Sequence, residues 1–96
     1  MATVTINSQS PDIFLPLLDI ALKRERKILR HSIEKVSNRI TLLSESLSVD
    51  PAALMAGEVP RSEKNEMDLI ELEGEIEILK HLQQQLTEME SVTVCD

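Results

Sequence analysis

The strongest constraint on the fold is a run of apolar residues spaced alternately four and three positions apart in the first half of the chain. Its members are Leu29, Ile33, Val36, Ile40, Leu43 and Leu47. This spacing is the a/d repeat of a helix that packs lengthwise against another helix. We therefore expect a long helix over about residues 12–48, with Leu22 as an earlier member of the same seam.

A second seam lies in the C-terminal half and consists of Leu69, Leu72, Ile76, Leu79, then Leu82 or Gln83, and then Leu86. It passes through residues 70–78, IELEGEIEI, where glutamate alternates with apolar residues as it would in a half-buried strand. Glutamate and glycine are poor strand formers, whereas glutamate is a good helix former. The seam therefore predicts a second helix over about residues 62–91.

Residues 49–61 connect the two predicted helices. Asp50 followed by Pro51 is typical of a helix start and Gly57 of a helix stop, so about one helical turn is expected between them. Two long helices with a short connector predict an all-α, antiparallel coiled-coil hairpin. We expect one domain over residues 1–96, with a strand-like arm at 1–9 and a strand-like tail at 92–96.

The hairpin also predicts which charges meet across it. If Leu47 lies beside the start of the second helix, Arg39 falls near Glu71 and Lys35 near Glu75. Exposed pairs of this kind contribute only about 0.2–1 kcal/mol each, so they influence register more than stability.

The second helix carries a further apolar face, formed by Met67, Ile70, Gly74, Ile78, Leu82 and Met89. A helix with two apolar faces needs two neighbours, and the first helix supplies only one. We expect a second copy to supply the other, giving a homodimer that forms a four-helix bundle. Gly74 on this face indicates close approach of another backbone, because glycine inside a helix costs roughly 1 kcal/mol relative to alanine.

Charge is divided unevenly along the chain, whose net charge is −7. Residues 1–49 contain seven basic and five acidic side chains, and residues 50–96 contain three and twelve. Such an acidic chain is a poor general binder of nucleic acid. The candidate electrostatic contacts are Lys23, Arg24, Arg26, Lys27 and Arg30 in the first helix, and Glu71, Glu73, Glu75 and Glu77 in the second. The basic run either is solvated, meets an acidic patch on another subunit or binds phosphates.

The sequence shows no arrangement typical of catalysis, so we expect neither an enzyme nor a cofactor. His31 and His81 fall at outward positions and lack the inward Glu-x-x-His pattern of bundle metal sites, so no metal site is predicted. Cys95 has no neighbour that would activate its thiol. Because we find neither a signal peptide nor an apolar run long enough to span a membrane, the expected location is the cytoplasm.

Several segments together resemble small prokaryotic antitoxin-like helical-hairpin proteins that are encoded beside a toxin. The segments are TVTI at residues 3–6, ALKRERKIL at 21–29, IEKVSNRI at 33–40 and ELEGEIEIL at 71–79. The resemblance implies a non-catalytic protein that binds and blocks a partner such as a toxic ribonuclease. In that case the carboxylates of the second helix would cover a basic substrate groove.

Two other functions are compatible with the sequence. A leading strand before a helix is also how ribbon-helix-helix DNA-binding regulators begin, and Thr3, Thr5 and Asn7 would then reach base edges. The unbroken first helix and the absence of basic residues from the strand argue against this function. The third alternative is a purely structural coiled-coil oligomer.

Overall fold

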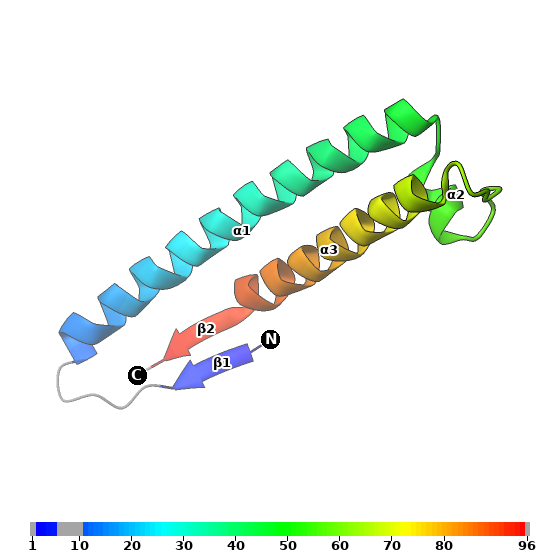
Figure 1. The fold of residues 1–96 in the computed structure, drawn as a ribbon. Coiled ribbons are helices and arrows are strands. Elements are labelled where there is room, and N and C mark those ends of the chain that lie inside the picture. The colour runs from blue at the N-terminus through cyan, green and yellow to red at the C-terminus, as the bar shows by residue number, and fades with distance from the viewer. Residues whose placement is uncertain (1, 6–10, 96) are drawn as a thin grey trace. The chain divides into compact units, whose positions relative to one another are not determined.

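The computed structural model describes the backbone of residues 2–5 and 11–95 and the side chains of residues 12–92. In chain order the elements are β1 (Ala2–Thr5), α1 (Pro11–Leu47), α2 (Pro51–Met55), α3 (Glu66–Glu90) and β2 (Val92–Cys95) (Figure 1). The prediction of two long helices that pack against one another is confirmed. Asn7, one of the three residues named for DNA contact, lies outside the described residues.

Helix α1 runs for 37 residues although Pro16 lies inside it. Pro16 is the sixth residue of this helix and has no N–H, so the hydrogen bond that residue 16 would donate to the Asp12 carbonyl is missing. The helix ends where Ser48 adopts the left-handed conformation, with φ of 54°. There the Val49 N–H donates to the Ser44 carbonyl at 3.0 Å and the Ser48 N–H to the Glu45 carbonyl at 3.2 Å. These two bonds form the usual left-handed helix stop, here without glycine.

Helix α2 follows the predicted start and stop signals. The Asp50 side chain accepts a hydrogen bond from the Ala52 N–H at 3.2 Å, and Pro51 occupies the first helical turn. Gly57, with φ of 75°, ends the turn. This short helix places Leu54 in the core, where its side chain is buried.

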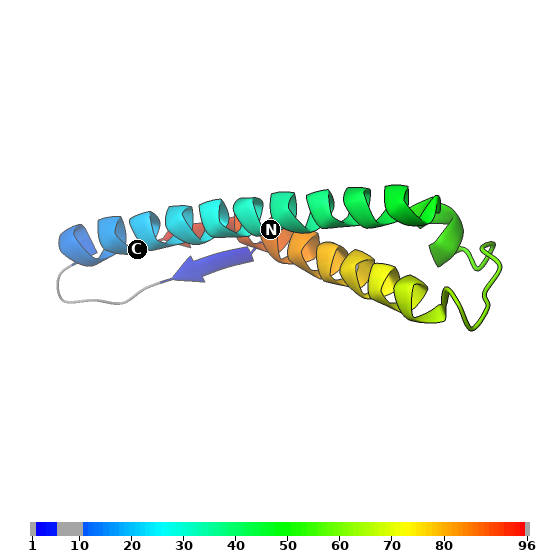
Figure 2. The same ribbon diagram turned by 45° about the horizontal axis from the view of Figure 1, so that its top comes forward.

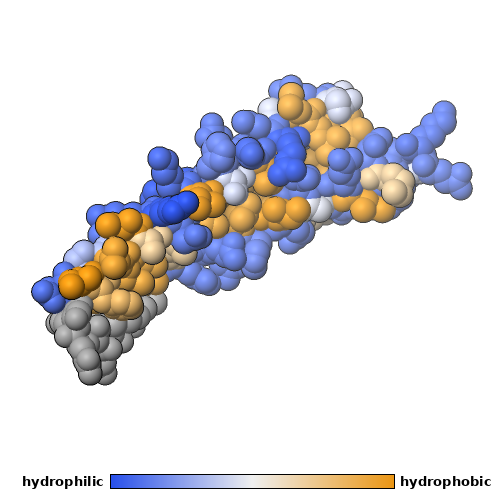
Figure 3. All heavy atoms as spheres, turned by 60° about the vertical axis from the view of Figure 1, so that its left-hand side comes forward, coloured by the Kyte–Doolittle hydropathy of each residue, from blue (hydrophilic) through white to orange (hydrophobic). Residues whose placement is uncertain are grey.

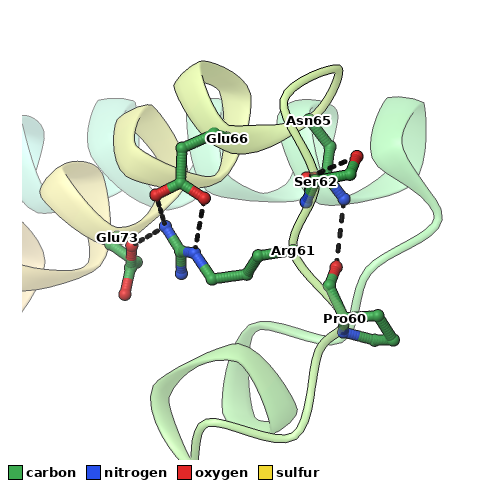
Figure 4. Close-up of polar contacts among 6 residues, drawn as sticks. All are labelled: Pro60, Arg61, Ser62, Asn65, Glu66 and Glu73. Atoms are coloured by element: carbon green, nitrogen blue, oxygen red, sulfur yellow. Dashed lines mark hydrogen bonds and ion pairs between the residues drawn. The ribbon is translucent and has the colours of Figure 1, made fainter.

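Helix α3 begins at Glu66, four residues later than the predicted start at residue 62. Asn65 determines this start, because its Oδ1 accepts from the Ser62 backbone N–H at 2.7 Å and its Nδ2 donates to the Pro60 carbonyl at 3.1 Å (Figure 4). Residues 63–65 form a turn that these bonds hold. The predicted start was too early because residues 63–65 form a turn before the helix, in which the Asn65 side chain reaches back to the Ser62 N–H as in a capping box.

The chain divides into two compact units, and α1 and α3 each contribute to both. Unit 1 consists of Met1–Ser32 and Leu82–Asp96, and unit 2 of Ile33–His81. In unit 2, part of α1 and part of α3 run antiparallel with α2 at one end (Figures 1 and 2). Its buried core consists of Val36, Ile40, Leu54, Leu69, Leu72 and Ile76.

Unit 1 contains β1, β2 and the adjoining parts of the long helices. The strands pair in parallel, with Ala2 opposite Val92 and Thr5 opposite Cys95. Several apolar side chains of the long helices are only half-buried here, namely Leu22, Leu29, Leu82, Leu86 and Met89. Among the described side chains of unit 1 none is fully buried, so this unit covers its apolar surface less completely than unit 2 does.

Candidate functional site

The outer face of α3 in unit 2 consists of Met67, Ile70, Gly74 and Ile78. These residues lie opposite Leu69, Leu72 and Ile76, which are buried against α1 and α2. Met67 is 76% exposed, Ile70 49% and Ile78 48%. Large apolar side chains gathered on one exposed helix face are typical of an interaction surface. The face of the molecule seen in Figure 3 also exposes hydrophobic side chains, coloured orange, between hydrophilic ones.

Gly74 lies in the middle of this face and leaves open space above the helix. A Cβ atom added to Gly74 would meet no atom within 4 Å. Packing inside the chain therefore does not explain the glycine, although it weakens the helix by roughly 1 kcal/mol. A second backbone approaching the outer face of α3 would explain it.

Leu82 and Met89 do not share the exposure of the other predicted members of this face. Both are half-buried, and Met89 lines a groove with Leu22 and Leu29 of α1. In unit 1 the half-buried positions of α3 are Leu82, Leu86 and Met89, spaced by four and three residues, so the covered stripe of the helix there passes through these two residues.

The four alternating glutamates do not form a single carboxylate surface. Glu73 Oε1 accepts from Arg61 Nη2 at 2.9 Å, and Glu75 Oε2 lies 3.7 Å from Arg39 Nε. Glu71 and Glu77 are exposed at the two edges of the outer face of α3, where Glu77 Oε1 lies 3.7 Å from Lys80 Nζ. Two residues that lie two positions apart in sequence are separated by about 200° around a helix, so their side chains point to different sides.

The ion pair between Arg39 and Glu75 corrects the predicted register. We expected Arg39 beside Glu71, which is one helical turn earlier on α3. The prediction aligned Leu47 with a helix that begins near residue 62, whereas α3 begins at Glu66. This later start moves the partner of Arg39 along α3 by the same number of residues, from Glu71 to Glu75. Glu71 instead borders a shallow groove with Arg39 and Leu42.

The basic run on α1 is partly neutralised within unit 1. Lys23 Nζ lies 2.9 Å from Asp19 Oδ2, and Arg30 Nη2 lies 3.6 Å from Glu90 Oε1. Arg26 is half-buried. Arg24 and Lys27 have no ion-pair partner among the described side chains and line a shallow groove with Ile28, His31 and Ser32.

Arg24 and Lys27 belong to an exposed face of α1 that the sequence did not reveal. This outer face of α1 consists of Ile13, Leu17, Ile20, Arg24, Lys27, Ile28 and His31. Its four apolar side chains are between 47% and 63% exposed. They are spaced by four, three and eight residues, with Arg24 in the long interval. That interval concealed the helical repeat, because the basic residues interrupt it.

Arg61 fastens the connector of unit 2 to α3 (Figure 4). Its Nε donates to Glu66 Oε2 at 2.9 Å and its Nη2 to Glu66 Oε1 at 3.0 Å, while the same Nη2 also reaches Glu73. These hydrogen bonds lower the pKa of Glu66 from its ordinary value of 4.5 and raise the pKa of Arg61. A bidentate pair of this geometry orients the connector at the start of α3.

The lowered pKa of Glu66 predicts how the stability of the protein depends on acid. The ionised Glu66 carboxylate stabilises the folded state above pH 4.5, which is the ordinary pKa of a glutamate. This stabilisation is lost as the pH falls through the lower pKa of Glu66 in the folded state. We expect Glu66→Gln to lower the melting temperature at neutral pH, and the difference from the wild type to shrink on acidification. Melting curves across this pH range test it. Glu58→Gln is the control, because Glu58 has no ion-pair partner among the described side chains.

Unit 1 contains a groove of about 580 Å³ between α1 and the end of α3. It is lined by Leu22, Glu25, Leu29, Gln85, Glu88, Met89, Ser91 and Val92. The lining is mainly apolar, and it lies along the half-buried part of the seam. This groove is a consequence of the incomplete closure of unit 1.

The described part of the chain shows no site for metal chemistry. His31 and His81 are exposed, and no group of three or more metal-ligating side chains gathers among the described residues. No described helix is both long enough and apolar enough to cross a membrane.

The pairing of β1 bears on the DNA-binding alternative. In that fold the strands of two subunits pair with each other. Here the partner of β1 is β2 of the same chain, in parallel. The side chains of Thr3 and Thr5 lie outside the described ones.

Comparisons with protein-family models, curated proteins and solved structures find no significant match to this chain. Its function is therefore inferred from its own residues.

Proposed function

We propose that this protein is a non-catalytic protein–protein interaction module that forms a homodimer and, as a dimer, a four-helix bundle. The outer face of α3 is the observation that supports this proposal. It exposes Met67, Ile70 and Ile78 around Gly74. A side chain at Gly74 would meet no atom of the chain within 4 Å, so packing within the chain does not require a glycine there. A chain of 96 residues has little core of its own, and association is a common remedy.

The half-buried seam of unit 1 adds to this proposal. Its groove and its exposed apolar side chains leave surface that a monomer exposes to water. Covering such surface favours association by roughly 25 cal/mol per Å² of apolar area, before the cost of immobilising two chains is subtracted.

The native mass of the wild-type protein tests self-association. We expect sedimentation equilibrium across the micromolar range to give twice the chain mass of 10.8 kDa. A mass that stays at one chain throughout this range would contradict the homodimer.

We further propose that the partner of the dimer is a small protein encoded beside it, as the antitoxin-like resemblance implies. Unit 2 supports this because it contains eleven acidic and only five basic side chains, a charge that suits a basic partner. Co-expression with the product of the adjacent gene tests it. We expect the two chains to co-purify and the partner's activity to be suppressed; two chains that separate on a sizing column would contradict it.

A further inference from the structure

The outer face of α1 is both apolar and basic, and no described side chain of its own unit forms an ion pair with its two cations. Arg24 and Lys27 have no ion-pair partner among the described side chains. Of the nearby acids, Asp19 is paired with Lys23 and Glu25 lines the groove with Leu22. An exposed face that combines these features fits an acidic, apolar helix.

We propose that the outer face of α1 in one copy packs against the outer face of α3 in a second copy, and reciprocally. This inference rests on the proposed homodimer and specifies which faces meet in it. The described residues supply both sides of the contact. The α3 face carries Glu71 and Glu77 at its edges, and the α1 face carries Arg24, Lys27 and His31.

Charge favours this arrangement over packing of α3 on α3. Two α3 faces in contact would bring the carboxylates of Glu71 and Glu77 toward the same carboxylates of the other copy. Like charges placed against each other in an interface disfavour it, whereas opposite charges steer and orient it. If the α3 face of one copy instead meets the α1 face of the other, Glu71 and Glu77 lie against basic side chains, and attraction replaces the repulsion at each of them.

The two faces also match in size and shape. The apolar residues Ile13 to Ile28 span about 22 Å of helix and Met67 to Ile78 about 17 Å, at 1.5 Å per residue. The α1 face is the bulkier, with three isoleucines and one leucine, and the α3 face has a gap at Gly74 that can receive a large side chain.

Each copy carries one face of each kind, so under two-fold symmetry a reciprocal pair of α1–α3 contacts uses all four faces. A head-to-tail arrangement of the same two faces would grow beyond the dimer, so the native mass distinguishes the two arrangements.

Charge reversal tests the inference in three samples. The first variant carries Arg24→Glu with Lys27→Glu, the second carries Glu71→Lys with Glu77→Lys, and the third sample is an equimolar mixture of both. All four positions are exposed, so the fold should persist, and circular dichroism checks it. We expect each variant alone to dimerise about tenfold or more weakly than the wild type, and the mixture to recover dimers that contain one chain of each variant.

The outcomes separate this inference from the proposed function. If the first variant dimerises as tightly as the wild type, α1 is not in the interface and the inference is overturned while the homodimer stands. If the wild type itself is monomeric, self-association fails and the inference fails with it. Recovery in the mixture cannot come from misfolding, because two misfolded variants would not restore each other.

Discussion

Leu72→Ala is expected to lower the free energy of unfolding by about 2–5 kcal/mol. Leu72 is 0% exposed and belongs to the only fully buried cluster among the described residues, so the removed side-chain atoms would leave a cavity. Domains of this size have total stabilities of roughly 5–15 kcal/mol, so the loss is a large fraction. Urea denaturation followed by circular dichroism, at one fixed protein concentration, measures it.

Leu42→Ala is the matched control for this prediction. It makes the same chemical change in the same unit, but Leu42 is 67% exposed. We expect it to change stability by no more than about 0.5 kcal/mol. Equal losses in the two variants would show that Leu72 does not lie in a packed core.

The double variant Ile70→Asp with Ile78→Asp is expected to weaken self-association by roughly a hundredfold or more. Burial of an isoleucine stabilises an interface by about 1.5–3 kcal/mol, and a buried aspartate without a partner opposes it. Both positions are about half exposed in the chain itself, so the hairpin should still fold. Sedimentation velocity measures the dimer fraction, and Thr41→Asp is the control at an exposed position of α1 outside both outer faces.

Gly74→Ala gives a second measurement on the same surface. Inside one chain the new methyl group meets nothing within 4 Å, so helix propensity alone should stabilise the hairpin by roughly 0.5–1 kcal/mol. If another helix approaches Gly74 closely, the same methyl group should weaken the dimer. A variant that is more stable and associates no less would refute close approach at this glycine.

The heptad spacing from Leu29 to Leu47 is enough to predict α1, because a regular apolar repeat over several turns has few other solutions. The pair Asp50 and Pro51 likewise predicts the position of α2. The start of α3 and the register of Arg39 could not be predicted in the same way. They depend on hydrogen bonds of the Asn65 side chain to Ser62 and Pro60, which leave no periodic signal.

The candidate interaction surfaces were predictable only in part. Met67, Ile70 and Ile78 follow from the second apolar stripe of α3, and the structure places them on the surface. The glutamates were grouped by their alternation in sequence, although a helix directs them to different neighbours. The sequence places Leu82 on the outer apolar stripe of α3, whereas the structure shows it half-buried; burial of a residue at the border of two stripes depends on packing that spacing alone does not give.

The pairing of β1 with β2 has a consequence for the order of folding. It joins residues ninety positions apart, such as Ala2 and Val92, whereas the helices are held by neighbours four residues away. Closing so long a loop is entropically unfavourable until the intervening chain is already compact. We therefore expect the two strands to pair last, so that protection of their backbone amides from hydrogen exchange would report that the intervening chain has folded.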